Sequence, residues 1–466
     1  MTPLPRGRAV IIGAGMAGLL AAHVLAQHME EVLVLERDVL PHQPLPRDGV
    51  PQGRHAHVLL VRGYRILRRF FPSLDQDLAK AGAPTICWTQ DVAALLAGGW
   101  MPRFPSDILG PSASREFLEW QVRQYVAAHP RVSLRGGHRV VDLHFLEKER
   151  VGGVVAVDKE GQEQIVPGDL VVDASGRSSR LPQWLEKQGY PAPAETRVNA
   201  KLGYSTRWYR IPPGWQADWK VVLLAARFPN IPRGAVILPV EGERWVVTLA
   251  GTGGDYPPTD PEGFLAFARS LAGPQVHQAI AGAEPLSPVY GYRRTENRWR
   301  HLERLPAWPR GLLALGDTVG AFNPVYGQGM TVAALAAEAL DALLSQDVPD
   351  LERAFQKRLA AILKTPWTLA TGEDLRWAGQ LSQAPSLSER FLYWYLEQMG
   401  ALLHKDRTVA RTFLAVTHLL ASPAAFFHPR ILAKVAAHLL TSRGSTDSRL
   451  PTPTPSSESP DRRGSG

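Results

Sequence analysis

The sequence predicts an α/β protein with a Rossmann-type nucleotide-binding domain, a second domain with a mixed or antiparallel sheet, and a helical C-terminal region. Three features near the N-terminus predict the Rossmann unit. The apolar run at residues 9–12 (Ala-Val-Ile-Ile) is typical of a strand buried on both faces of a parallel sheet. The stretch Gly13-Ala14-Gly15-Met16-Ala17-Gly18 follows it with G-x-G-x-x-G spacing. A helical pattern then leads to a second apolar strand at residues 32–35, which ends in Glu36.

Each residue type in this unit has a physical role in binding a dinucleotide. Gly13 permits a tight turn, and Gly15 has no side chain to hold a pyrophosphate away from the backbone. Gly18 lets the helix lie close to the strand, so that the amides of its first turn point at the phosphates. Glu36 can accept hydrogen bonds from ribose hydroxyls, and its charge would repel a 2′-phosphate. The pattern therefore favours FAD or NAD over NADP.

The composition describes a basic protein that can bury a large core. The chain has 466 residues, and 45% of them are hydrophobic, which is enough for two or more subdomains. Its formal charge is +8, but the basic residues are spread along the chain and no nucleic-acid-binding motif is present, so we expect no nucleic-acid partner. Cys87 is the only cysteine, which excludes an intramolecular disulfide and any C-x-x-C site.

We expect a cytoplasmic protein. The N-terminal apolar run is interrupted by glycines and already serves as the first sheet strand, so it is not typical of a secretory signal. The sequence has no uninterrupted apolar segment of about 20 residues, so we expect no helix that spans a membrane. The sequence specifies no oligomeric state.

A loop rich in arginine, glycine and histidine follows the second strand. Residues 47–57 (Arg-Asp-Gly-Val-Pro-Gln-Gly-Arg-His-Ala-His) suit a loop that lies over an anionic ligand better than a solvated linker. His55 and His57 would share a face of an extended chain, either as ligand contacts or as hydrogen-bonded structural side chains. No carboxylate or cysteine stands at a useful spacing beside them, so we expect no metal site.

Residues 62–71 have helical periodicity, and a second helix is expected to begin near residue 114. Ser112 or Ser114 can cap it, and apolar residues recur behind them at helical spacing. Arg115 then stands in the first turn, where the helix dipole disfavours a positive charge. Either an anion above the helix end explains Arg115, or a surface ion pair with Glu119 does.

The middle of the chain predicts strands of two kinds. Residues 132–157 alternate in polarity, with turns expected at Gly152-Gly153 and at 159–161. Residues 169–173 predict another buried parallel strand. Its end, 173–180 (Asp-Ala-Ser-Gly-Arg-Ser-Ser-Arg), is a polar turn of the kind that binds ligands in open α/β sheets.

Residues 195–292 indicate a largely antiparallel sheet, with a hairpin over 235–249 that turns at Gly242. Four tryptophans in this segment either line an apolar substrate chamber or form ordinary core: Trp208, Trp215, Trp219 and Trp245.

The parallel pattern returns at residues 311–317, a strand that closes with Gly316-Asp317. A loop over 322–330 then leads into a helix over 331–344. An acid at the end of such a strand can accept from a ribityl hydroxyl. The Gly327-Gln328-Gly329 turn would let a flavin ring approach the helix N-terminus, whose dipole stabilises negative charge. The alternative is an ordinary strand-to-helix turn, which explains the glycines but not the acid.

The C-terminal part is predicted to be mostly helical, with amphipathic stretches at 351–363, 391–403 and 431–440 that pack against the nucleotide-binding domain. The alternative is a peripheral membrane contact of the C-terminal helices through residues 426–430 (Phe-Phe-His-Pro-Arg) and the helix that follows them. Residues 441–466 are rich in Ser, Pro, Thr and Arg and predict a disordered tail. The predicted segments are 1–190, the first part of the nucleotide-binding domain; 191–295, a substrate domain; 296–345, the return of the nucleotide-binding domain; 346–440, the helical region; and 441–466, the tail.

Together these motifs resemble those of the single-component FAD-dependent monooxygenases of the para-hydroxybenzoate hydroxylase fold, most closely the branch with squalene-epoxidase-like and polyether epoxidases. The resemblance covers roughly residues 8–345 and rests on the glycine motif with Glu36, on Arg115, on Asp173-Ala174-Ser175-Gly176 and on Gly316-Asp317. It implies FAD as the cofactor, NAD(P)H as a transient electron donor and an apolar small molecule as the substrate.

The resemblance also implies a set of FAD-binding residues. They are Gly13, Ala14, Gly15, Ala17 and Gly18 at the pyrophosphate; Glu36 and Arg37 at the adenosine ribose; Arg47 near the ribityl chain or ring; Arg115 at a phosphate or the ribityl region; Asp317 at the ribityl hydroxyls; and Gly327 and Gly329 beside the isoalloxazine.

One motif departs from the family pattern. Typical hydroxylases end the middle motif in Asp-Gly, whereas Ser175 precedes Gly176 here and the acid is Asp173. Because that pair serves both FAD and NADPH in the family, the departure affects the expected nicotinamide site. NAD(P)H would bind transiently, or a partner reductase would supply the electrons, because no second G-x-G-x-x-G unit is present. A similar Asp-Ala-Ser-Gly occurs in flavin reductases of isoprenoid chains and, more loosely, in flavin halogenases, but the halogenase signature Trp-x-Trp-x-Ile-Pro is absent.

The activity that the resemblance implies is hydroxylation or epoxidation through a flavin C4a-hydroperoxide. This chemistry needs an oriented substrate and exclusion of water rather than a covalent nucleophile, and we assign no catalytic acid or base. Two alternatives are a flavin-dependent reductase of isoprenoid double bonds and a non-catalytic flavin-binding protein.

Overall fold

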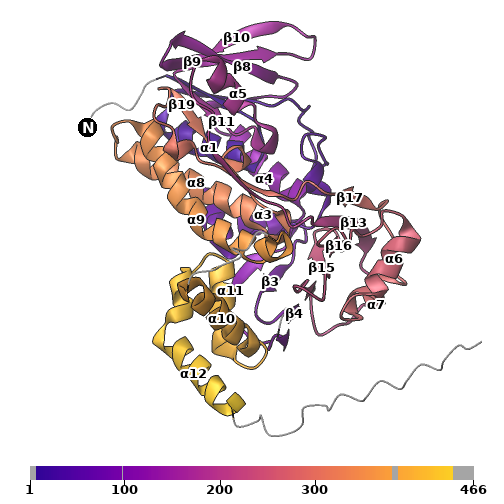
Figure 1. Cartoon of the computed structure of the whole chain (residues 1–466). Coiled ribbons are helices and arrows are strands. Elements are labelled where there is room, and N and C mark those ends of the chain that lie inside the picture. Colours follow the sequence, from indigo (N-terminus) through magenta and orange to yellow (C-terminus); the bar gives the residue numbers. More distant parts are fainter. Residues whose placement is uncertain (1–6, 97, 380–386, 444–466) are drawn as a thin grey trace, which may run out of the picture.

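A computed structural model describes residues 7–96, 98–379 and 387–443 of the chain. Its centre is a five-stranded sheet in which every neighbouring pair is parallel (Figure 1). The strands, in spatial order, are β19 (Leu312–Ala314), β11 (Leu170–Asp173), β1 (Arg8–Ile12), β2 (Glu31–Leu35) and β7 (Val132–Arg135). The Rossmann-type α/β fold predicted from the sequence is thereby confirmed.

The register of this sheet brings four strand ends into one row. Ile12 pairs with Leu35 on one side and with Asp173 on the other, and Asp173 pairs in turn with Ala314. Because the strands are parallel, the turns that follow these residues leave the sheet at the same edge. Segments that are far apart in the sequence therefore meet there.

Helices pack against the parallel sheet, and strands β9 (Arg150–Val157) and β10 (Glu163–Pro167) of a small antiparallel sheet also contact it, at β11 and β1. Helix α1 contacts α4 and α8, and α8 lies in turn between α1, α2 and α9 (Figure 1). The helices of this part are α1 (Met16–His28), α2 (Val61–Phe70), α3 (Leu74–Lys80), α4 (Arg115–Ala127), α5 (Leu181–Lys187), α8 (Gln328–Ser345) and α9 (Leu351–Trp377). Helix α8 begins three residues before the predicted start.

A seven-stranded sheet forms the second body, and all its neighbouring strands are antiparallel except β14 and β4. Helices α6 (Pro261–Arg269) and α7 (Gln275–Ile280) pack on one face of it (Figure 1). In spatial order the strands are β17 (Tyr290–Tyr292), β13 (Gly203–Arg210), β16 (Arg244–Gly251), β15 (Arg233–Val240), β14 (Val221–Leu224), β4 (Val92–Leu96) and β5 (Gly99–Trp100).

Two features of the strands differ from the sequence prediction. The segment 92–100, which was assigned to the nucleotide-binding domain, supplies β4 and β5 to the second sheet. The prediction of a turn at Gly152-Gly153 is wrong, because both residues lie inside β9 (Arg150–Val157). A β-carbon on Gly153 would stand 2.3 Å from the Val166 carbonyl oxygen, so this glycine permits a close approach of neighbouring strands.

Smaller elements complete the fold. Three small sheets contain β8 (Arg139–Glu147), β9 and β10 (Glu163–Pro167); β12 (Glu195–Val198), β18 (Asn297–Arg300) and β20 (Gly320–Ala321); and β3 (Thr85–Cys87) with β6 (Leu109–Pro111). Short 3-10 helices are η1 (Pro51–Arg54), η2 (Gly176–Ser178), η3 (Leu302–Arg304), η4 (Gly316–Thr318), η5 (Pro324–Tyr326) and η6 (Pro423–Phe427).

The C-terminal helices α10 (Leu387–Leu402), α11 (Arg407–Thr417) and α12 (Pro429–Arg443) form a separate helical layer beside α9 (Figure 1). Helix α12 extends three residues past the predicted boundary at 440, and the rest of the predicted tail, 444–466, lies outside the described residues. No helix among the described residues combines the length and apolar character needed to cross a bilayer.

His418 joins this helical layer to the N-terminal half. Its Nδ1 accepts a hydrogen bond of 3.3 Å from the Val61 amide, and its ring packs on Trp88 at 4.9 Å between centroids. The side chain is buried, and burial lowers its pKa to about 3. His418 is therefore neutral in the folded protein at any ordinary pH.

This burial predicts a pH-dependent stability. The unfolded chain protonates His418 near pH 6.5 and the folded chain only near pH 3, so the free energy of unfolding should fall as pH falls below about 6.5. His418→Gln should reduce that slope by about 1.4 kcal/mol per pH unit, measured by urea unfolding between pH 4.5 and 6.5. The exposed His42→Gln serves as control, and an unchanged slope in His418→Gln would contradict a buried neutral imidazole.

Candidate functional site

A cleft of about 470 Å³ opens at the carboxyl edge of the parallel sheet. Of the twelve residues predicted to bind the cofactor, ten line it: Gly13, Gly15, Ala17, Glu36, Arg37, Arg47, Arg115, Asp317, Gly327 and Gly329. The other two support its wall, since Ala14 lies in the turn itself and Gly18 packs behind it. Residues spread over more than 300 positions of the sequence thus face one space.

The glycine turn has the geometry that the sequence predicts. Gly13 adopts φ +101°, and a β-carbon there would lie 2.7 Å from the Ala174 carbonyl oxygen. At Gly18 a β-carbon would lie 1.9 Å from the Gly13 carbonyl oxygen, so only glycine lets α1 approach β1 this closely. Gly15, the N-cap of α1, has no protein atom within 4 Å of its ideal β-carbon position. The open space in front of the helix end is suited to a phosphate.

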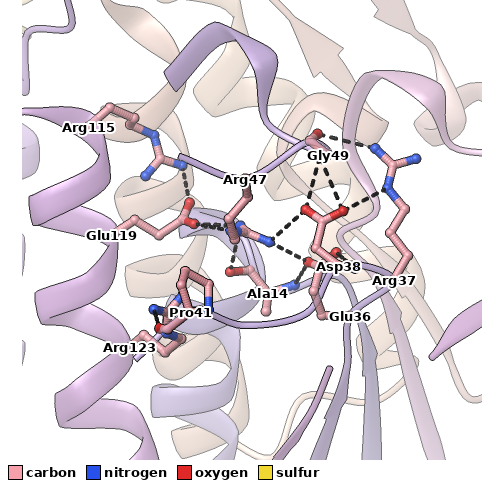
Figure 2. Close-up of polar contacts among 10 residues, drawn as sticks. All are labelled: Ala14, Glu36, Arg37, Asp38, Pro41, Arg47, Gly49, Arg115, Glu119 and Arg123. Atoms are coloured by element: carbon pink, nitrogen blue, oxygen red, sulfur yellow. Dashed lines mark hydrogen bonds and ion pairs between the residues drawn. The ribbon is translucent and has the colours of Figure 1, made fainter. Parts of the chain in front are cut away.

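Glu36 and Arg47 form a buried charged cluster behind this turn (Figure 2). The Ala14 amide donates to Oε2 of Glu36 at 2.7 Å, and Nη1 of Arg47 lies 3.2 Å from the same oxygen. Arg47 also donates to Glu119, at 2.9 Å from Nε and 2.5 Å from Nη2, and contacts Asp38 at 3.3 Å. Although burial acts to lower it, Glu119, Glu36 and Asp38 raise the pKa of Arg47. Arg47 thus lies beside Glu36 in the wall of the cleft, and its predicted place near the ribityl chain or ring stays a prediction.

Arg115 forms the ion pair with Glu119 that was one of the two explanations left open by the sequence. The Ser114 hydroxyl accepts from the Phe117 amide at 3.1 Å and caps α4, which confirms the predicted helix start. Nη2 of Arg115 pairs with Glu119 at 2.6 Å, but the pair is buried and not on the surface. Nη1 of Arg115 is also buried and has no hydrogen-bond partner among the described residues. Arg115 also lines the cleft, where the positive charge of its guanidinium is suited to an anion.

Asp317 and the turn before α8 form the other end of the cleft. Asp317 follows β19, and Oδ1 lies 3.8 Å from the position that a β-carbon on Gly329 would occupy. Burial raises the pKa of Asp317, against the opposing effect of Arg177 and Arg298. Gly327 has φ +65° and starts α8, and the Gln328 side chain beside it is buried with no partner for Oε1 among the described residues.

In the motif Asp173-Ala174-Ser175-Gly176, the acidic side chain points into the protein. Asp173 is fully buried, and its Oδ1 accepts from the Ser175 amide at 2.9 Å and the Ser175 hydroxyl at 2.5 Å. Its Oδ2 accepts from the Ser179 hydroxyl at 2.6 Å. Asp173 therefore stabilises its own turn, while Ser175, Gly176 and Arg177 line the cleft.

The two histidines of the 47–57 loop have different environments. His55 is buried and its Nδ1 lies 2.7 Å from the Thr206 hydroxyl, as in the structural interpretation. His57 lines the cleft, and its Nδ1 donates to the His55 carbonyl at 2.9 Å. Burial, with Arg115 nearby, lowers the pKa of His57 to about 4, so its ring is neutral with Nε2 left as an acceptor.

Sequence reasoning missed several residues of the cleft. Arg177 lines it and is held by the carbonyls of Glu296, at 2.7 Å, and Phe322, at 2.9 Å. Gln328 was noted only as part of a turn. The four tryptophans proposed for a substrate chamber do not line the cleft; Trp215, Trp219 and Trp245 pack in the core of the second sheet. No cluster of His, Cys, Asp and Glu side chains suited to a metal ion occurs within the part of the chain described by the structure.

Several known proteins are similar to this chain in sequence. A family model described as an NAD(P)-binding Rossmann-like domain matches residues 11–40. The chain is 34% identical over 463 residues to Protein Rv3254 of Mycobacterium tuberculosis, with 94% of each chain covered. It is 27% identical over 357 residues to kynurenine 3-monooxygenase of Salinispora tropica, with 73% of each covered.

Solved structures show the same fold. The flavin-dependent brominase Bmp2 superimposes with a TM-score of 0.66 at 15% identity, covering 95% of this chain and 100% of that one. PqsL, a probable FAD-dependent monooxygenase from Pseudomonas aeruginosa, gives 0.60 at 19% identity, covering 80% and 99%. Squalene epoxidase 3 of Arabidopsis thaliana matches at 24% identity over 70% of this chain and 57% of that protein. The chain is therefore only distantly related to squalene epoxidase, and not closely related to it as the sequence motifs predicted.

Matched substitutions in the glycine turn test its two roles. Gly15→Ala adds a methyl group where no protein atom is near, so the fold should be retained while FAD binds at least about tenfold more weakly. Gly13→Ala forces a strained φ and a 2.7 Å contact with the Ala174 oxygen, and should destabilise the protein by about 2 kcal/mol or more.

Thermal unfolding without FAD measures the loss of stability in Gly13→Ala, and quenching of FAD fluorescence on titration measures the loss of affinity in Gly15→Ala. Gly15→Ala with unchanged FAD affinity would contradict a pyrophosphate at this turn.

Proposed function

Because this chain belongs to the family of FAD-dependent monooxygenases and halogenases, we propose that it is a monooxygenase that hydroxylates or epoxidises an apolar small molecule. FAD is its bound cofactor and NAD(P)H its electron donor. The observation that carries the proposal is the single cleft onto which the Gly13 turn, Arg115, Asp317 and the Gly327 turn open. Bound FAD supplies the redox chemistry and the reaction with oxygen.

The residues present fit FAD at both ends of the cleft. At the nucleotide end, the open space before Gly15 would take the pyrophosphate, and Glu36 would accept from the ribose. Arg115, which lines the cleft between the two ends, would place its positive charge beside a phosphate or the ribityl chain. At the ring end, Asp317 would accept from ribityl hydroxyls, and the start of α8 would face the pyrimidine edge, where its dipole stabilises negative charge.

The chain's own contribution to the reaction is binding, orientation and exclusion of water. The ring end is lined by the apolar side chains of Val58, Phe322 and Pro324, together with the neutral His57. An apolar substrate would replace water at these side chains. With Nδ1 donating to the His55 carbonyl, His57 would offer Nε2 as a hydrogen-bond acceptor to a substrate hydroxyl or amide.

A flavin-dependent reductase of isoprenoid double bonds is the second candidate. The Asp173-Ala174-Ser175-Gly176 turn favours it, because a similar turn occurs in such reductases. A non-catalytic flavin-binding protein is the third candidate, and it would bind FAD without turnover.

Oxygen dependence separates these candidates. For the monooxygenase we expect substrate to accelerate NAD(P)H oxidation at least about tenfold, with one oxygen molecule consumed per nicotinamide, measured with an oxygen electrode beside absorbance at 340 nm. Because Glu36 would repel a 2′-phosphate at the glycine turn, NADPH must bind elsewhere and should not compete with FAD.

Aromatic and polyene metabolites are the substrates to screen. Turnover that persists without oxygen would support the reductase instead, and halide-dependent product would place the chain with the halogenases.

We also propose that the C-terminal helices contact an anionic membrane surface. Leu387, Phe391 and Trp394 stand at i, i+4 and i+7 of α10 with 82%, 58% and 41% of their surface exposed. Phe427 of η6, 40% exposed, extends the patch, because both it and Phe391 stack on the Tyr395 ring, at 4.9 Å and 6.4 Å. Arg390 and Arg430 are exposed beside these residues in sequence, which favours lipids of opposite charge.

Vesicle flotation tests this surface. The wild-type chain should float with phosphatidylserine-containing vesicles, and Phe391→Ser/Trp394→Ser should reduce the bound fraction at least about fivefold. Ile165→Ser, which removes a 56% exposed side chain on β10, is the matched control and should bind like the wild type. Equal flotation of all three proteins would exclude α10 as the contact.

A further inference from the structure

A buried carboxylate of helix α9 holds the turn that leads into α8. Asp374, 1% exposed, accepts three hydrogen bonds: from Nδ2 of Asn297 at 2.7 Å, Nδ2 of Asn323 at 2.9 Å and the Tyr326 hydroxyl at 2.7 Å. Asn297 and Asn323 are equally buried. The Asn323 amide also donates to Oδ1 of Asn297 at 2.7 Å, which closes the network. Four residues from three elements are thereby tied together.

All the donors to this carboxylate are neutral. Asp374 has no ion pair with any described residue, and burial raises its pKa while the hydrogen bonds from Asn323, Tyr326 and Asn297 oppose that shift. An apolar side chain would anchor a helix here without desolvating a charge. A buried acid with three fixed donors instead restricts the turn to one conformation, since each donor would lose its partner if the turn moved.

The network acts on the backbone that faces the cleft. Asn323, once held by Asp374, uses its own Oδ1 to accept from the Val325 amide at 3.3 Å and so caps η5. This short helix ends at Gly327, whose left-handed conformation is also the N-cap of α8. The direction of the α8 N-terminus therefore depends on Asn323 and Tyr326, and both are held by Asp374.

We propose that Asp374 is a positioning residue for the flavin: it fixes the 322–327 turn and thereby aims the N-terminus of α8 at the isoalloxazine. This inference rests on the proposed function, because it takes the ring to lie at Gly327. It assigns a role to the C-terminal region, which otherwise has no residue in the cleft among those described.

The same end of α9 also holds the second sheet. Glu373 accepts from the Phe228 amide at 3.1 Å, and Trp377 packs on the Phe228 ring at 5.2 Å. Phe228 lies in the loop between β14 and β15. One helical turn thus contacts both the turn before α8 and the body that carries the proposed substrate side, so an error in its position would affect both.

Two measurements on the full chain test the proposal. Hydrogen exchange without FAD reports on the turn itself, and we expect the amides of 322–327 to exchange at least tenfold faster in Asp374→Ala. FAD titration should give an at least tenfold higher Kd, with a changed circular dichroism of the bound flavin. Asp374→Asn keeps an acceptor for the two asparagines and an amide that can donate to the Tyr326 oxygen, so it should stay within threefold of wild type.

Thr371→Val is the matched control. Thr371 is buried one turn earlier on α9 and donates only to its own helix, at the Trp367 carbonyl. In this variant, the exchange rates of the 322–327 amides and the Kd for FAD should stay within twofold of the wild-type values, even if the melting temperature falls. If Asp374→Ala does not fold, Tyr326→Phe, which removes one of the three hydrogen bonds, should give the same two changes at smaller size.

The outcomes separate the two proposals. A wild-type chain that binds no FAD overturns the proposed function, and hydrogen exchange still decides whether Asp374 holds the turn. Wild-type exchange and FAD affinity in a folded Asp374→Ala or Tyr326→Phe protein overturn the role of Asp374, whatever the chain binds. Equal effects in Thr371→Val would reduce that role to general helix stability.

Discussion

The turns that end strands β1, β11 and β19 touch one another through glycine backbone, and the rest of the site depends on that contact. A β-carbon on Gly13 would lie 2.7 Å from the Ala174 oxygen, and one on Gly316 would lie 2.7 Å from the β-carbon of Ala17. Side chains of any size would separate these turns and fill the space between them. Because glycine at these two positions has no side chain, the backbone amides of three distant segments can face one ligand.

Charge at the site follows from the cost of burying ions. Glu36, Arg47, Glu119 and Arg115 lie next to one another with almost no solvent exposure, and each is paired. Pairing lowers the cost of desolvation but uses up the donors that take part in it. What remains is one guanidinium nitrogen of Arg115 that has no partner among the described residues. The cluster therefore ties residues of the cleft wall to one another through buried ion pairs.

The C-terminal helices support the site from behind. Helix α9 packs along α8, and the buried carboxylate of Asp374 reaches the turn from which α8 starts. His418, at the end of α11, contacts α2 in the same way through a buried polar group. Polar contacts of this kind restrict geometry more than apolar packing does, because they are lost with small displacements. The nucleotide-binding domain and the helical region are thus coupled through specific hydrogen bonds.

The sequence by itself determined the parallel sheet, the glycine turn and a helix cap at Ser112 or Ser114, because these follow from local patterns of apolar periodicity, glycine spacing and helix capping. It also brought Asp317 and the Gly327 turn to the same edge, since parallel strands place their turns together. Only the tertiary structure decided which polar groups meet. Arg47 pairs with Glu119, Gly152-Gly153 lies within a strand, and Asp374 reaches Tyr326, each through contacts with other elements of the fold. Such contacts leave no periodic signal, because they depend on where whole elements pack.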